Sequence, residues 1–211
     1  QEKAGLLKDI ERADSLKLTP LTYHGTRILE CRELAVSYPG MTGRPVSFTL
    51  RPGDRLCLDG SNGSGKTSLL RLALGEDVPC TGSLFRASGL MISYVPQKSD
   101  HLQGSLTDWA QRQNVDLTRF LTVLRKLDFS RVLFQRDMES YSAGQRKKVL
   151  IAASLCQSAH LYIWDEPLNY IDLFSRMQIE ELLLQYRPTL LFVEHDRAFR
   201  EKIATQTVCQ N

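Results

Sequence analysis

The run GSNGSGKT at residues 60–67 contains the residue types needed to hold phosphate groups. It matches the pattern G-x-x-x-x-G-K-[ST], and it follows an apolar strand and opens a helix at Lys66, as the pattern requires. Glycines let the backbone bend so that successive N–H groups converge on phosphate oxygens, and the helix start adds the positive end of its dipole. Lys66 would contact the β- and γ-phosphates, and the Thr67 hydroxyl would bind Mg²⁺.

A flexible glycine turn is the alternative interpretation, but it does not account for every fixed position being filled in this context. We therefore predict a nucleotide site with bound ATP and Mg²⁺. The predicted nucleotide-binding residues of this loop are Gly60, Ser61, Asn62, Gly63, Ser64, Gly65, Lys66, Thr67 and Ser68.

A second pattern, LYIWDE at residues 161–166, is an apolar strand that ends in two carboxylates. Asp165 at a strand end beside the phosphate loop suits Mg²⁺ or a water bound to it. Glu166, one residue further on, can reach a water in line with the γ-phosphate and act as general base. Acidic strand ends are common, so this pattern gains its weight from following a phosphate loop.

The segment YSAGQ at residues 141–145 resembles the signature of the ABC ATPase family, usually written LSGGQ. In that family the signature serine and glycine lie at a helix N-terminus and bind the γ-phosphate of a nucleotide held by the opposite domain. The resemblance implies this role for Ser142, Gly144 and Gln145. Tyr141 and Ala143 depart from the usual form, and an ordinary serine N-cap is the alternative.

The remaining positions of that family's pattern follow in order. Tyr38 resembles the aromatic that stacks on adenine, and Gln97 the glutamine that senses Mg²⁺ and the attacking water. Residues 168–172 resemble the loop that crosses to the partner domain, and His195 resembles the switch histidine that touches the γ-phosphate. Taken alone, these would be a core tyrosine, a loop glutamine and a structural histidine. The resemblance makes Glu166, His195 and Gln97 the predicted catalytic residues. The predicted metal ligands are Thr67, Gln97 and Asp165.

Strands and helices alternate in a way that predicts a largely parallel α/β sheet. Continuous apolar runs predict the strands. The segments between and after these runs carry apolar stripes of helical period, which predict helices. With the resemblance, the expected fold class is an α/β P-loop NTPase. It has a mostly parallel sheet flanked by helices, an antiparallel β subdomain and an inserted helical subdomain over about residues 105–140.

Length and composition fit one soluble domain, because 42% of the 211 residues are apolar and no apolar run approaches the ~20 residues needed to cross a bilayer. The N-terminus does not resemble a signal peptide. Five cysteines without CxxC spacing argue against a disulfide framework or a zinc site, so we expect a cytoplasmic location. A net charge of +3 is too small to indicate nucleic-acid binding. The basic cluster at residues 146–148 is expected on the solvated side of the signature helix, rather than in an RNA-binding patch.

Two features resemble the ABC-F class, in which two ABC domains on one chain act on the ribosome. Residues 1–20 resemble the end of the charged helix that links those domains, and the interval from Lys66 to Ser142 is short for a transporter. The run at residues 163–172 resembles the antibiotic-resistance branch, which displaces lincosamide, streptogramin A or pleuromutilin drugs from the ribosome. The resemblance implies a linker end at residues 1–20 and a C-terminal ABC domain at residues 21–211 of a longer protein. Its partners would be a second ABC domain, in the same chain or as a homodimer, and the ribosome.

The alternative is the ATP-binding subunit of an ABC membrane transporter, which would dock on membrane helices. Repair and chromosome ATPases usually carry long coiled-coil or zinc insertions between these motifs, and the sequence has none. A second ABC domain upstream in the full gene would favour the ABC-F class, whereas adjacent genes for membrane-spanning proteins would favour the transporter.

Overall fold

The computed structural model describes residues 16–38 and 41–210. Most of the linker helix expected over residues 1–20 lies outside this range, and residues 16–20 have no regular secondary structure. The chain divides into two compact units. Within the described residues, the sheet unit comprises residues 20–97, 158–168 and 186–210, and the helical unit comprises residues 16–19, 98–157 and 169–185.

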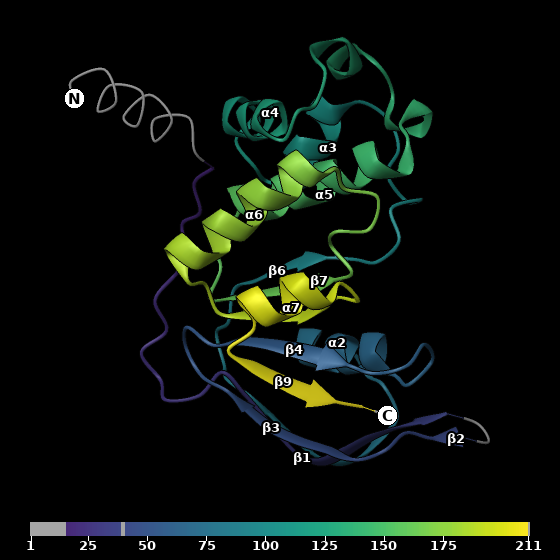
Figure 1. Cartoon of the computed structure of the whole chain (residues 1–211), viewed down its shortest axis with the longest axis vertical. Coiled ribbons are helices and arrows are strands. Elements are labelled where there is room, and N and C mark those ends of the chain that lie inside the picture. Colours follow the sequence, from purple (N-terminus) through teal and green to yellow (C-terminus); the bar gives the residue numbers. More distant parts are fainter. Residues whose placement is uncertain (1–15, 39–40, 211) are drawn as a thin grey trace. The chain divides into compact units, whose positions relative to one another are not determined.

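A five-stranded parallel sheet, in the order β6-β7-β8-β4-β9, forms the centre of the sheet unit (Figure 1). Its strands are β4 (Arg55–Asp59), β6 (Ile92–Val95), β7 (Leu161–Asp165), β8 (Leu190–Val193) and β9 (Gln206–Cys209). Strands β7 and β8 are buried along their whole length. Continuous burial explains why their sequences are uninterrupted apolar runs rather than alternating ones, because a parallel sheet is covered on both faces.

Successive residues of β8 show how the two faces are covered. Leu191 and Val193 belong to an apolar core that includes Leu69 and Leu70 of helix α2 (Lys66–Leu74). Phe192 points to the opposite face, where its ring meets Phe199 of helix α7 (Arg197–Ile203) edge to face, with centroids 5.8 Å apart. The two-residue period of a strand thus fixes which side chains face α2 and which face α7.

A second, antiparallel sheet consists of β1 (Leu29–Tyr38), β2 (Met41–Thr42), β3 (Val46–Leu50) and β5 (Cys80–Arg86). Strand β1 is its centre, because β2, β3 and β5 all pair with it. The buried residues Leu29 of β1 and Leu50 of β3 belong to the same core as Leu56 of β4. The long β1 carries Tyr38 at its end.

The helical unit contains four α-helices and two 3-10 helices within the described residues. They are α3 (Leu106–Arg112), α4 (Leu117–Lys126), η1 (Arg131–Gln135), η2 (Met138–Ser140), α5 (Ala143–Cys156) and α6 (Leu173–Tyr186), whose last residue belongs to the sheet unit. Ser105 and Asp116 cap α3 and α4 by accepting an amide N–H three residues further on. The apolar stripe expected on α4 is buried at Phe120 and Leu124.

The expectation that residues 146–148 lie on a solvated helix face is wrong for two of the three. Lys147 is 2% exposed and Lys148 is 8% exposed, because α5 is buried from residue 147 to residue 155. The Lys148 ammonium lies 2.6 Å from Asp172 Oδ2. Burial opposes ionisation of Asp172, but Lys148 and the amide and hydroxyl of Ser175 outweigh it and lower the pKa of Asp172 to about 2.

The predicted fold class is confirmed, with a parallel sheet flanked by helices, an antiparallel sheet and a helical unit. All five cysteines lie within the described residues and carry free thiols, and Cys31 and Cys57 belong to the core. No helix between residues 16 and 210 is long and apolar enough to span a membrane. The domain boundaries, including the helical insertion at 105–140, stay predictions.

Candidate active site

Residues 60–65 connect β4 to α2 in a backbone conformation that needs glycine. Gly60 has a φ of +151°, and a Cβ atom here would lie 2.2 Å from the carbonyl oxygen of Gln210. Gly65 caps the N-terminus of α2 with a φ of +98° and brings no side chain to compete for the first amide groups of the helix. An anion can therefore approach the positive end of the α2 dipole.

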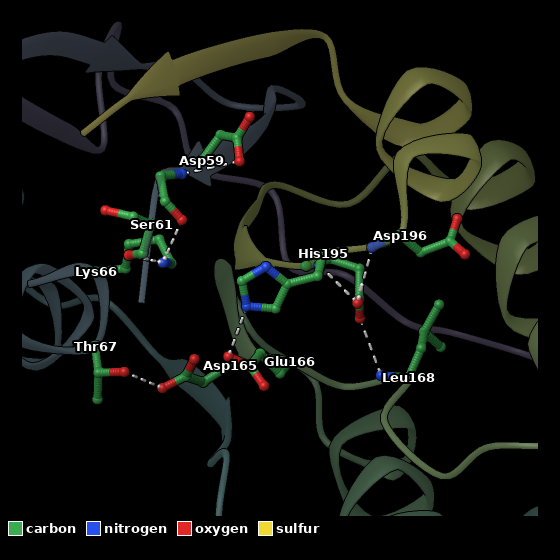
Figure 2. Close-up of polar contacts among 11 residues, drawn as sticks. Asp59, Ser61, Lys66, Thr67, Asp165, Glu166, Leu168, His195 and Asp196 are labelled. Atoms are coloured by element: carbon green, nitrogen blue, oxygen red, sulfur yellow. Dashed lines mark hydrogen bonds and ion pairs between the residues drawn. The ribbon is translucent and has the colours of Figure 1, made fainter. Parts of the chain in front are cut away.

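The ammonium group of Lys66 lies inside this loop. Its Nζ donates to the carbonyl oxygens of Gly60 and Ser61 at 2.7 and 2.8 Å (Figure 2). Lys66 is only 7% exposed, so these charge-assisted bonds hold the loop around a positive charge. A phosphate group entering the loop would meet that charge.

Thr67 and Asp165 lie together although 98 residues separate them in the sequence. The Thr67 hydroxyl donates to Asp165 Oδ2 at 2.9 Å, and Asp165 is fully buried at the end of β7. Within residues 16–38 and 41–210, His, Cys, Asp and Glu do not form a cluster of three or more that could hold a metal ion. Mg²⁺ does not need one, since one or two protein oxygens plus nucleotide phosphates are its usual ligands. This pair of hard oxygen donors fits Mg²⁺.

Glu166 and His195 form the second polar pair of the site. His195 Nε2 lies 3.1 Å from Glu166 Oε1 (Figure 2). Glu166 has a φ of +48°, an uncommon conformation for a residue with a side chain. Its N–H donates to the carbonyl oxygen of Val193 at 2.9 Å, which joins the ends of β7 and β8.

A cavity of about 490 Å³ in the sheet unit brings most of the predicted residues together. Its volume lies in the range of small-molecule sites. Tyr38 lines the cavity and is 41% exposed, so its ring is accessible to a ligand. The residues that line the cavity are Tyr38, Asn62, Gly63, Gly65, Lys66, Thr67, Ser68, Gln97, Glu166 and His195.

Several predicted residues do not line this cavity. Gly60 and Ser61 accept hydrogen bonds from Lys66 through their carbonyl oxygens, and Asp165 accepts one from the Thr67 hydroxyl. Ser64 is partly buried and its hydroxyl has no hydrogen-bond partner in the described part of the chain.

The signature residues belong to the helical unit, at the start of α5. Ser142 Oγ accepts the Gln145 N–H at 3.2 Å, and the Ser142 N–H donates to Gln145 Oε1 at 2.9 Å. This capping box is what the N-cap interpretation predicts. Gly144 is required here because a Cβ atom would lie 2.5 Å from the Tyr170 carbonyl oxygen. Phosphate contact by Ser142, Gly144 and Gln145 stays a prediction.

The sequence motifs indicate no role for two carboxylates near the site, Asp59 and Glu194. Asp59 Oδ1 accepts the Gly60 N–H at 2.8 Å, and its other oxygen forms an ion pair with Arg200 of α7. The hydrogen bond from Arg200 lowers the pKa of Asp59. The sequence did offer a signal for Asp59, because this acidic residue stands directly before the glycine-rich loop. Glu194, directly before His195, is 3% exposed.

Comparisons with known proteins identify the family. The sequence profile of the ABC transporter family matches residues 44–169, more than half of the chain. The ribosome protection protein VmlR of Bacillus subtilis (strain 168) is 32% identical over 211 residues, covering 93% of this chain and 38% of VmlR. The zinc import ATP-binding protein ZnuC of Yersinia pestis bv. Antiqua (strain Antiqua) is 34% identical over 175 residues, covering 79% of this chain and 68% of ZnuC.

Among solved structures, RNase-L Inhibitor matches with a TM-score of 0.69 and 23% identity, over 88% of this chain and 38% of that chain. At this identity the match supports the fold alone. The predicted resemblance to ABC ATPases, and to ABC-F ribosome protection proteins among them, is confirmed. The chain therefore belongs to the ABC transporter family and is an ATP-binding, ATP-hydrolysing domain of that family.

Proposed function

We propose that this domain binds Mg-ATP in the cavity and that Glu166 acts as the general base in its hydrolysis. The main support is that one cavity is lined by Lys66, Thr67, Glu166 and His195, which come from three separate parts of the sequence. Adenine stacks on Tyr38, and the phosphates bind the amide groups of the loop and the Lys66 ammonium.

Magnesium, when bound, neutralises phosphate charge, and Thr67, Asp165 and Gln97 hold it or its waters. Glu166 takes a proton from the attacking water, whose oxygen forms a bond to the γ-phosphorus. The bond between the γ-phosphorus and the bridging oxygen breaks and leaves ADP and phosphate. His195, at 3.1 Å, orients the Glu166 carboxylate and can donate to a γ-phosphate oxygen.

A second ABC domain completes the site. ABC domains work in pairs, and Ser142, Gly144 and Gln145 of one domain contact the γ-phosphate held by the other. A domain without a partner lacks these contacts to the γ-phosphate and therefore hydrolyses ATP slowly.

This domain is the C-terminal ABC domain of a longer ABC-F protein. That full-length protein acts on the ribosome in antibiotic resistance. Its similarity to VmlR, which extends over 93% of this chain, supports this role. The linker end at residues 1–20 and the ABC domain at residues 21–211 belong to the same proposal. The second candidate function is that of a transporter subunit. It is favoured by the 34% identity to ZnuC, because this chain covers a larger share of ZnuC than of VmlR.

The variant Glu166→Gln in the full-length protein tests the catalytic proposal. Steady-state ATP hydrolysis is expected to fall by about 100-fold or more, because a general base contributes on that scale. ATP affinity, measured by titration, is expected to stay the same. The exposed Glu181 on α6 offers a matched control, and Glu181→Gln is expected to leave turnover unchanged. Unchanged turnover in Glu166→Gln means that another residue is the base.

The same variant separates the two biological roles. If the protein acts on ribosomes, Glu166→Gln traps the ATP-bound state, and the protein co-sediments with ribosomes in ATP but not in ADP. Absence from ribosomes, with recovery in a complex with membrane-spanning subunits, overturns the ABC-F role and supports the transporter.

A further inference from the structure

Glu194 is a buried carboxylate with no role in the proposed hydrolysis. It is 3% exposed and directly follows β8. A carboxylate is costly to bury unless hydrogen bonds satisfy its oxygens. Its position beside the site, rather than in the apolar core, indicates that these bonds serve the site.

Both oxygens of Glu194 accept backbone N–H groups, from two different segments. Oε2 accepts the Leu168 N–H at 3.2 Å. Oε1 accepts the N–H groups of His195 at 2.8 Å and Asp196 at 3.3 Å. Figure 2 draws these three bonds as dashed lines from the labelled residues Leu168, His195 and Asp196. Glu194 thus joins the segment that follows Glu166 to the segment that begins with His195.

The segment after Glu166 needs such a partner. Glu166 has the left-handed φ of +48°, which a residue with a Cβ adopts only when its surroundings impose it. Its own N–H is held by Val193. Pro167 has no N–H, so Leu168 carries the first amide after Glu166 that can be held from β8, and Glu194 accepts it.

We propose that Glu194 is a positioning residue for ATP hydrolysis. By binding the amides of Leu168 and His195 with one carboxylate, it keeps the Glu166 carboxylate and the His195 imidazole at their 3.1 Å separation and facing the γ-phosphate site. The proposal rests on the proposed function, because it assigns Glu194 a task in the reaction that Glu166 catalyses.

Glu194→Gln tests the role in the full-length protein because it preserves size but removes one acceptor. The remaining amide oxygen can serve His195 and Asp196, and the NH₂ group then faces the Leu168 N–H and cannot accept it. We expect kcat to fall roughly 10-fold in Glu194→Gln and about 100-fold in Glu194→Ala, the scale of a misplaced catalytic group. The KM for ATP is expected to change less than about threefold, because neither variant touches the phosphate loop.

The control is Glu201→Gln, the same chemical change at an exposed residue of the nearby helix α7, which is expected to leave kcat unchanged. If thermal unfolding shows no folded Glu194→Ala protein, the isosteric variant Glu194→Gln provides the test. A Glu194→Gln variant with wild-type kcat overturns the proposal, and so does a rise in KM at unchanged kcat.

A double-mutant cycle with Glu166→Gln distinguishes positioning from a general structural effect. If Glu194 acts through Glu166 and His195, adding Glu194→Gln to Glu166→Gln lowers the residual rate by clearly less than the roughly 10-fold loss in the wild-type background, since one of the two groups it positions is already inactive. Fully multiplicative losses overturn the proposal. If Glu166→Gln alone leaves the rate unchanged, the proposed function fails first, which is visible without any Glu194 variant.

Discussion

The close approach of Gly60 to Gln210 makes a sharp prediction about the phosphate loop. A Cβ atom at Gly60 would lie 2.2 Å from the Gln210 carbonyl oxygen and 2.9 Å from its carbonyl carbon. These are backbone atoms, and Gln210 is itself tied to the loop because its N–H donates to the Asp59 carbonyl oxygen at 2.7 Å. Gly60→Ala must therefore displace the loop or the chain end that packs on it.

The matched control is Gly53→Ala, in the turn between β3 and β4. Gly53 has a φ of +83°, and nothing lies within 4 Å of a Cβ atom built there. Its substitution costs only backbone strain, about 1–2 kcal/mol. Gly60→Ala incurs similar strain plus a steric overlap of about 1–3 kcal/mol, for a total of roughly 2–5 kcal/mol.

Urea unfolding of the two variants measures this difference, and ATP titration measures its functional consequence. Gly60→Ala is expected to be less stable than Gly53→Ala by at least about 1 kcal/mol and to bind ATP roughly 10-fold or more weakly. Gly53→Ala is expected to bind ATP normally. Equal stabilities of the two variants would mean that the Gln210 backbone does not constrain residue 60.

Two further predictions concern the helical unit. Gly144→Ala places a Cβ atom 2.5 Å from the Tyr170 carbonyl oxygen, so urea unfolding should show a loss of roughly 1–3 kcal/mol, and wild-type stability would contradict this close approach. Asp172→Asn should cost about 1 kcal/mol at pH 7, after allowance for solvent screening of a half-exposed carboxylate paired with Lys148. Because the folded pKa of about 2 lies below the ordinary value of 3.8, this contribution is present above pH 4 and disappears as the pH falls towards 2. A difference between wild type and Asp172→Asn that stays constant from pH 7 to pH 2 would contradict it.

Local sequence patterns predicted those parts of the site whose geometry depends on a short segment. The loop at residues 60–67 prescribes its own bend through glycines, and the helix that begins at Lys66 follows from the same pattern. The apolar runs of β7 and β8 predicted buried strands, because burial on both faces requires uninterrupted apolar residues.

Features that depend on distant contacts were not predictable in this way. The burial of Lys147 and Lys148 follows from what surrounds α5, and the partner of Lys148 is Asp172, which the basic cluster does not reveal. Glu194 lies 26 residues from its partner Leu168, and a single acidic residue before a histidine resembles many exposed ones. Only the pairing of β7 with β8 makes its burial and its bonds apparent.

Strand order explains why residues so far apart in sequence form one site. Strands β6, β7, β8 and β4 are parallel neighbours in that order, so their carboxyl ends lie along one edge of the sheet. Gln97 follows β6, Glu166 follows β7, His195 follows β8 and the phosphate loop follows β4. Ligands of open α/β sheets bind at this edge. Moving β8 elsewhere in the order would separate His195 and Glu194 from Glu166, although every motif in the sequence would be unchanged. The motifs therefore supply the chemistry of the site, and the pairing of β8 between β7 and β4 makes it one site.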